Sequence, residues 1–179
     1  SVIQVADAKN LRRSLLLSLQ LAEMKIPFLL DLNMEDESLS RGITIHKEKL
    51  SELLGVPVVG TVAIEKKGLG DLKKKGTPRS PSSFKPSYSP EIEGGIKRIE
   101  DLLPDTPISK RSLSLMILAG DKTLTEWLHK NLAETVIEQM EKIRSDISRQ
   151  FGPPIPFVIE KQRLRWVDRL LSQIVTQSR

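Results

Sequence analysis

The sequence contains no cysteine and only two histidines, His46 and His129, among its 179 residues. The absence of cysteine excludes disulfides, thiolate zinc sites, cysteine-bound iron–sulfur clusters and a cysteine nucleophile. Two histidines that lie far apart in sequence do not favour a histidine-rich metal site, so a tight divalent site would have to use carboxylates. We therefore expect no metal site in this chain.

Long apolar runs and clustered charge are also missing. No stretch approaches the roughly 20 apolar residues that a membrane span requires. The hydrophobic fraction of 39% is enough for a packed core and argues against a disordered chain. The net charge of +5 is spread out, with 12 of the 28 basic residues before residue 77 and 16 after it. This spread does not favour nucleic-acid binding. The run Lys73-Lys74-Lys75 favours a solvated helix end over a phosphate contact.

The first part of the chain has an α/β pattern. Leu11, Leu15 and Leu19 recur at a spacing of four, which predicts an amphipathic helix over residues 10–24. The apolar run at 26–32 is typical of a strand buried on both faces, as in a parallel sheet. Further strands are expected at 2–6 and 56–59, and a second helix at about 46–54, ending at Gly55. This alternation predicts a doubly wound parallel sheet.

The second part predicts an all-α unit. Residues 76–90 hold four prolines and five serines, which indicates an exposed linker or, as an alternative, an extended ligand for a partner domain. Helices are expected from Ser89-Pro90 onward and over 109–119. One long helix and a last helix follow, with apolar stripes that favour a core over a partner surface. The stripe residues are Leu128, Leu132, Val136, Met140, Ile143 and Ile147, then Leu164, Val167, Leu171 and Ile174. Trp127 and Trp166 are interpreted as core residues too.

Two polar loops follow neighbouring strands of the predicted sheet. Asn33-Met34-Glu35-Asp36 ends the second strand, and Thr61-Val62-Ala63 ends the third. Ligands of such sheets bind beyond the carboxyl ends of the strands. Asp36 could accept two hydrogen bonds from guanine, from N1–H and from the amino group, whereas adenine lacks that donor pair. Asn33 could bridge the base and the neighbouring loop, and the N–H groups of Val62 and Ala63 could meet the guanine carbonyl. The tetrapeptide alone is also compatible with a simple helix cap.

The order of these motifs resembles the second half of the GTPase domain of the ferrous iron transport protein B family. The matching text includes Ala6–Leu11, Leu32–Glu37, Arg41-Gly42-Ile43, Leu50–Val59 and Gly68-Leu69. The resemblance implies that Asn33, Met34 and Asp36 read the guanine base, and that Thr61, Val62 and Ala63 form the last guanine-contacting loop. Met34 replaces the lysine of most GTPases, as is usual in this family. Lys66 departs from the family, which usually has glycine there.

The second part resembles the same family's helical domain. Tyr88–Glu93, Lys110–Leu115, Leu118–Asp121 and Arg163–Leu171 carry this likeness. It implies that residues 1–76 form the C-terminal half of a Ras-like GTPase (G) domain, 77–88 a Ser/Pro-rich linker, and 89–179 a small helical bundle. The implied location is the cytoplasmic face of a bacterial or archaeal cell membrane. The implied ligand is GTP or GDP, and the implied partners are the rest of the G domain and the transporter's membrane domain.

The phosphate-binding motif of a GTPase is absent from the sequence. A P-loop has the pattern Gly-x-x-x-x-Gly-Lys-Ser/Thr, and Gly120-Asp121-Lys122-Thr123 does not fit it. We therefore expect that the chain begins within a domain, has no magnesium ligands and does not hydrolyse GTP alone. Its first strand would lack a neighbour, so a homodimer through this edge is expected. The alternative function is a basic helical module that binds protein, anionic lipid or nucleic acid.

Overall fold

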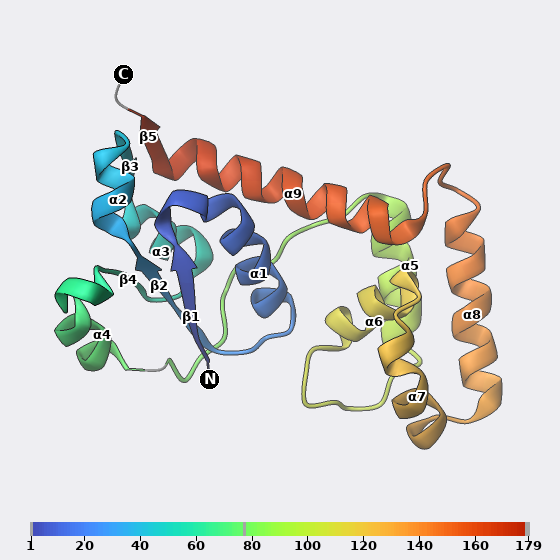
Figure 1. Ribbon diagram of the computed structural model, residues 1–179. Helices are drawn as coiled ribbons and strands as arrows, with labels where there is room; N and C mark the ends of the chain where they lie inside the picture. Colours follow the sequence, from blue (N-terminus) through green and yellow to red (C-terminus); the bar gives the residue numbers. More distant parts are fainter. Residues whose placement is uncertain (1, 77, 178–179) are drawn as a thin grey trace. The chain divides into compact units, whose positions relative to one another are not determined.

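The computed structural model describes residues 2–76 and 78–177. The chain divides into two units, Ser1–Pro86 together with Leu164–Arg179, and Ser87–Arg163. Figure 1 shows the elements of each unit. The first unit contains β1 (Val2–Asp7), the 3₁₀ helix η1 (Ala8–Asn10), α1 (Leu11–Glu23), β2 (Phe28–Asn33), α2 (Glu35–Ser40), β3 (Ile43–Ile45), α3 (Lys47–Leu54), β4 (Val58–Thr61), η2 (Ala63–Glu65) and α4 (Leu69–Lys75).

The first unit is built on a parallel sheet of order β1-β2-β4, which confirms the predicted α/β fold class. Lys73–Lys75 end α4, as expected for the basic run. The short helix α2 and the short strand β3 had no clear periodicity in the sequence. β3 pairs in antiparallel fashion with β5 (Val175–Gln177), a strand from the end of the chain.

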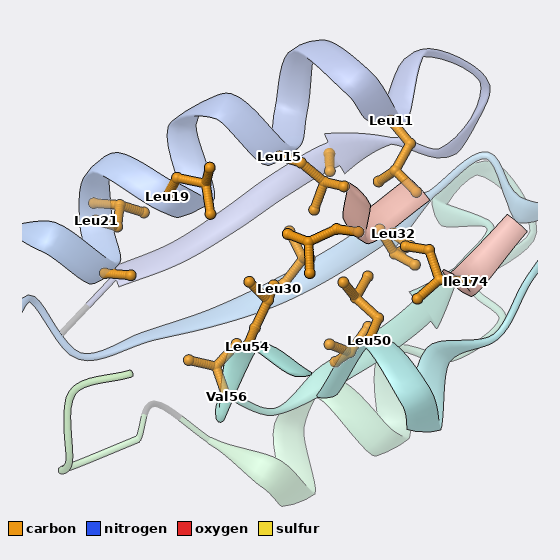
Figure 2. Close-up of a cluster of buried hydrophobic side chains, with 14 of the residues drawn as sticks. Leu11, Leu15, Leu19, Leu21, Leu30, Leu32, Leu50, Leu54, Val56 and Ile174 are labelled. Atoms are coloured by element: carbon orange, nitrogen blue, oxygen red, sulfur yellow. The ribbon is translucent and has the colours of Figure 1, made fainter. Parts of the chain in front are cut away.

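A cluster of buried leucines holds α1 and α3 against the sheet (Figure 2). Leu15 and Leu19 of α1 and Leu50 of α3 are completely buried. The four-residue spacing in α1 places its leucines on one face, because residues i and i+4 lie on the same side of a helix. Ile174, near the end of the chain, is also completely buried in this cluster. The core of the sheet unit therefore includes a side chain from far along the sequence.

The second unit is helical, as expected. Its helices are α5 (Pro90–Glu100), α6 (Lys110–Ala119), the 3₁₀ helix η3 (Lys122–Leu124), α7 (Thr125–Asn131) and α8 (Glu134–Ser148), and α9 (Ile155–Ile174) begins in it. The predicted stripe of α8 is confirmed as core, because Met140, Ile143 and Ile147 are buried. Trp127 packs against this core and Trp166 against the core of the first unit.

The single long helix expected through Leu128 to Ile147 is wrong, since the chain breaks between α7 and α8. Leu132 and Ala133 both adopt extended backbone angles. The Asn131 side chain donates to the Trp127 carbonyl at 2.8 Å and so satisfies the helix end locally. Such side-chain bonds compete with continuation of a helix.

The Ser/Pro-rich segment is also less exposed than its composition predicts. Ser82 is buried, and its hydroxyl donates to the carbonyl of Leu54 at the end of α3. Phe84 packs edge-on against Trp166, with ring centres 5.6 Å apart. A Cβ on Gly55, which has φ = 64°, would lie 2.0 Å from the Ser83 hydroxyl oxygen. The segment therefore lies against the sheet unit over part of its length.

The end of the chain packs differently from the expected boundary, which assigned residues 89–179 to one helical domain. Val167, Leu170 and Ile174 of α9 lie in the core of the sheet unit. The backbone N–H of His46 donates to the Ile174 carbonyl at 2.8 Å, and β5 then pairs with β3. The boundary shifts because α9 contributes apolar side chains to both cores. Ile155 and Ile159, near its start, lie in the core of the helical unit, whereas its later apolar residues lie in the core of the sheet unit.

We predict that Ile174→Ala lowers the stability of the sheet unit by about 2–5 kcal/mol, because it leaves a cavity in a packed core. The measurement is urea denaturation followed by the fluorescence of Trp166 in a Trp127→Phe background. Leu39→Ala is the matched control, because Leu39 is 54% exposed. An unchanged Trp166 transition in the Ile174 variant would contradict this assignment of the chain end.

Candidate functional site

The parallel register aligns the carboxyl ends of three strands. Asp7 of β1 lies beside Asn33 of β2, and Asn33 lies beside Thr61 of β4. The loops that follow these strands therefore emerge at one edge of the sheet. The structure brings the two predicted motifs together there, because each begins at one of these aligned residues.

Asn33 connects the loop after β2 with the loop after β4. Its side-chain oxygen accepts a hydrogen bond from the Ala63 backbone N–H at 3.1 Å. The same oxygen lies 3.4 Å from the Thr61 hydroxyl. The Thr61 hydroxyl has a single hydrogen, and the shorter contact, at 2.8 Å, directs it to Asp31. The hydrogen bond from the Ala63 N–H is therefore the one by which Asn33 holds the Thr61-Val62-Ala63 segment.

Asp31 supports this contact from within the strand. The Thr61 hydroxyl donates to Asp31 Oδ1 at 2.8 Å, and Asp31 is only 5% exposed. Burial raises the pKa of Asp31 above its ordinary value of 3.8, and the hydrogen bond from Thr61 partly opposes this shift. Asp31 was not among the residues predicted from the sequence. The signal was a lone acidic residue within the apolar strand, two positions before Asn33 and hence on the same face.

Asp36 lies in the first turn of α2 and is exposed to solvent. It forms no hydrogen bond or ion pair with any residue in the described part of the chain. The hydrogen bond and charge of Glu65 raise the pKa of Lys67, with a smaller contribution from the charge of Asp36. Asp36 therefore lies close enough to the loop after β4 for its charge to act on Lys67. Its two oxygens are free to accept a pair of N–H donors.

Met34 precedes α2 in the left-handed conformation, with φ = 64°, and its side chain is 38% exposed. Such a φ is uncommon for a residue with a side chain. The turn it makes lets the chain leave β2 and start α2 within one residue. Met34 therefore lies on the surface between Asn33 and Asp36.

The loop after β4 closes on itself. Val62 and Lys67 exchange backbone hydrogen bonds of 3.2 and 3.3 Å. Lys66, where the resembled family usually has glycine, takes the left-handed conformation that glycine favours, with φ = 57°. Gly68 is required by close approach, because a Cβ there would lie 2.2 Å from the Gly60 carbonyl oxygen.

These hydrogen bonds revise the expected roles of two N–H groups. The N–H of Val62 donates to Lys67, and that of Ala63 donates to Asn33. Both are therefore already used within the protein. The N–H of Ile64, whose residue is 91% exposed, has no partner in the described part of the chain. It is the free donor at the tip of this loop.

Two ion pairs flank Asp36, and neither was predicted from the sequence. Lys47 pairs with Glu35, and Lys9 pairs with Glu37. Within residues 2–76 and 78–177 no three His, Cys, Asp or Glu side chains are grouped to hold a metal ion. Over the same residues, no helix combines the length and the apolar character needed to cross a membrane.

Known proteins are similar to this chain over most of its length. A family model described as "Ferrous iron transport protein B" matches residues 1–76, and one described as "FeoB cytosolic helical domain" matches residues 88–176. The Fe(2+) transporter FeoB of Staphylococcus aureus (strain COL) is 29% identical over 184 residues, covering 98% of this chain and 27% of that protein. The Fe(2+) transporter FeoB of Escherichia coli (strain K12) is 43% identical over 72 residues, covering 40% of this chain and 9% of that protein.

A solved structure is similar over nearly the whole chain. The crystal structure of an S. thermophilus NFeoB mutant bound to GDP superposes with a TM-score of 0.87 at 29% identity. The match covers 98% of this chain and 69% of that one. The parallel sheet and the helical unit therefore define a G-domain type of α/β fold joined to a helical domain.

This chain belongs to the ferrous iron transport protein B (FeoB) family. The two matching models leave only residues 77–87 and 177–179 outside them. The chain spans about a quarter of the length of the curated S. aureus relative, 27%.

We predict that Asp31→Asn changes how stability depends on pH. The folded pKa of Asp31 is raised, so its favourable contribution is present below about pH 3.8 and is lost as the pH rises through the raised value. An amide can still accept the Thr61 hydroxyl but cannot ionise. The stability of the unchanged protein should therefore fall relative to the variant as pH rises from about 3.8.

Urea denaturation between pH 3 and pH 8 measures this difference through Trp166. Asp71→Asn is the control, because Asp71 is exposed in the same unit. A difference between the unchanged protein and the Asp31 variant that stays constant over this pH range would contradict the prediction.

Proposed function

We propose that this chain supplies the guanine-recognition half of the G domain, together with the helical domain, of a GTP-binding ferrous iron transporter. The observation that carries the proposal is the hydrogen bond from Ala63 to Asn33, which joins the two loops beside the free carboxylate of Asp36. Membership of the FeoB family and the likeness to a GDP-bound NFeoB structure support it.

Each residue has a proposed role that follows from its position. Asp36 accepts hydrogen bonds from guanine N1–H and the exocyclic amino group, and the Met34 side chain lies along the base. Asn33 holds the loop formed by Thr61, Val62 and Ala63 at the base edge. The guanine carbonyl then meets the free N–H of Ile64. Adenine would present an acceptor to Asp36 at N1, which the carboxylate rejects.

The ligand is GTP or GDP, and this chain meets its base. The residues present fit a guanine base but include no P-loop, so the phosphates and magnesium need residues outside these 179. A bound magnesium ion would neutralise charge on the phosphates during hydrolysis. The remainder of the G domain is therefore a proposed partner of this chain.

We further propose that the chain lies at the cytoplasmic face of a bacterial or archaeal cell membrane and couples nucleotide binding to Fe(II) uptake. The path would run through α9, which begins in the helical unit and ends in the sheet unit. The carbonyl of its last residue, Ile174, accepts a hydrogen bond from the backbone N–H of His46. The next strand, β5, pairs with β3, which follows α2 along the chain. The membrane domain of the transporter is the proposed second partner.

We predict that Asp36→Asn weakens GDP binding by about 1–3 kcal/mol, because it removes a charged hydrogen-bond acceptor. The variant should bind xanthosine diphosphate better than the unchanged protein does, because xanthine has a carbonyl where guanine has its amino donor. The measurement is titration calorimetry on the complete transporter of which this chain is proposed to be a part. Asp71→Asn, at an exposed carboxylate of α4, is the control. Equal GDP affinity in the Asp36 variant and the unchanged protein would show that Asp36 does not read the base.

The free edge of β1 supports a proposed homodimer of this chain. In the described sheet β1 pairs only with β2. Ile3 and Val5 are 44% and 64% exposed. An open edge with apolar side chains favours pairing with another strand.

Sedimentation of the 179-residue chain tests this, with a dimer expected. Val5→Lys should give a monomer, because a charge on an edge strand opposes pairing. Ile64→Lys is the control, since Ile64 is more exposed than Val5 but lies outside the strand. A monomeric unchanged chain would rule out this assembly.

A further inference from the structure

Helix α2, which carries Asp36, has little to hold it in place by itself. It has six residues, and Met34 before it provides no side-chain cap. Its buried side chain is that of Ser38, whose hydroxyl donates to the carbonyl of Glu35 within the helix. Leu39 is 54% exposed. A helix this short is not stable alone, and α2 lacks the apolar face that usually anchors a helix.

Two lysines from other elements compensate for this. Lys47 Nζ of α3 lies 2.5 Å from Glu35 Oε1, and Lys9 Nζ of η1 lies 2.7 Å from Glu37 Oε2. The Lys47 and Glu35 side chains are each 29% exposed, whereas in the other pair Lys9 is 16% and Glu37 is 46% exposed. Water screens such partly buried pairs less than fully exposed ones. The two ion pairs therefore connect α2 to η1 and to α3.

The Glu35–Lys47 pair also lies directly over β4. A Cβ on Gly60 would be 2.3 Å from Glu35 Oε2 and 2.7 Å from Lys47 Nζ. The lack of a side chain at Gly60 therefore makes room for the pair. Because Gly60 immediately precedes Thr61, this contact ties the start of α2 to the strand that ends at the candidate loop.

Three consecutive carboxylates, Glu35, Asp36 and Glu37, occupy the first turn of α2. Successive residues of a helix point about 100° apart around its axis. The two outer carboxylates are held by lysines from different elements, whereas Asp36 forms no ion pair within the described residues. Holding the two outer residues sets the rotation of α2 about its axis, and hence the direction of the Cα–Cβ bond of Asp36 between them.

We propose that Lys9 and Lys47 are positioning residues for guanine specificity: by binding Glu37 and Glu35 they set the rotation of α2 and leave Asp36 as the single unpaired carboxylate of that turn. This inference rests on the proposed function. Neither lysine needs to touch the nucleotide. Their effect lies in the direction in which Asp36 presents its two oxygens.

The inference has a consequence that a general structural role does not share. Two parallel hydrogen bonds to guanine require alignment of both Asp36 oxygens. Hypoxanthine keeps N1–H but lacks the exocyclic amino group, so it uses one of the two bonds. A rotated Asp36 loses the advantage of guanine over hypoxanthine, whereas a general loss of stability or charge weakens both bases alike.

The experiment uses titration calorimetry to compare the affinities of GDP and inosine diphosphate for the complete transporter of which this chain is proposed to be a part. Lys9→Met and Lys47→Met keep the length of the side chain and remove its charge. We expect each to lower the GDP-to-inosine diphosphate affinity ratio about threefold, and the double variant about tenfold. Lys49→Met is the matched control on α3, because Lys49 is exposed and forms no ion pair within the described residues. It should leave the ratio unchanged.

A charge exchange provides a rescue test. Lys9→Glu combined with Glu37→Lys restores an ion pair of reversed polarity and should recover the ratio. The inference is overturned if the lysine variants keep the ratio, or if they lose GDP and inosine diphosphate affinity equally. A guanine preference that Asp36→Asn abolishes and the lysine variants retain overturns this inference alone. An unchanged protein with no guanine preference overturns the proposed function as well.

Discussion

The side-chain oxygen of Asn33 is the contact on which the candidate site depends. It accepts the Ala63 N–H and lies within reach of the Thr61 hydroxyl, so it joins loops that follow different strands. The parallel register makes this possible, because Asn33 and Thr61 are paired across β2 and β4. The carboxylate of buried Asp31 accepts the hydrogen bond that the Thr61 hydroxyl donates. The result is a loop whose two ends are held by hydrogen bonds to β2.

The elements around this contact are held by two different forces. Apolar packing holds α1, α3 and the end of α9, whose leucines, valine and isoleucine are withdrawn from water. Helix α2 lies at the edge where polar groups must stay accessible, so it has no apolar side chain in the core. Ion pairs to Lys9 and Lys47 take the place of that packing. Because such pairs are screened by salt, the edge that carries Asp36 is more sensitive to ionic conditions than the core is.

Helix α9 gives this FeoB chain its second organising feature. One amphipathic helix contributes Ile155 and Ile159 to one core and Val167 to the other. The helix that begins in the helical unit therefore ends within the sheet unit. The strand that follows it, β5, pairs with β3, which comes directly after α2, the helix that carries Asp36.

Local signals in the sequence determined most of the secondary structure and the identity of the two motifs. Leucine spacing indicated α1, the apolar run indicated β2, and Gly55 marked a helix end, because each of these effects acts within a few residues. Asn33 and Asp36 were found for the same reason, since their spacing after a strand is a local pattern.

Only the tertiary structure decided which groups are left free to bind a ligand. The N–H groups of Val62 and Ala63 are consumed by partners that no local pattern identifies. The lysine partners of Glu35 and Glu37 come from separate elements. The pairing of β3 with β5 joins residues 130 to 134 positions apart. Hydrogen bonds, ion pairs and strand pairing of this kind depend on distances in space, which the fold sets and sequence spacing does not.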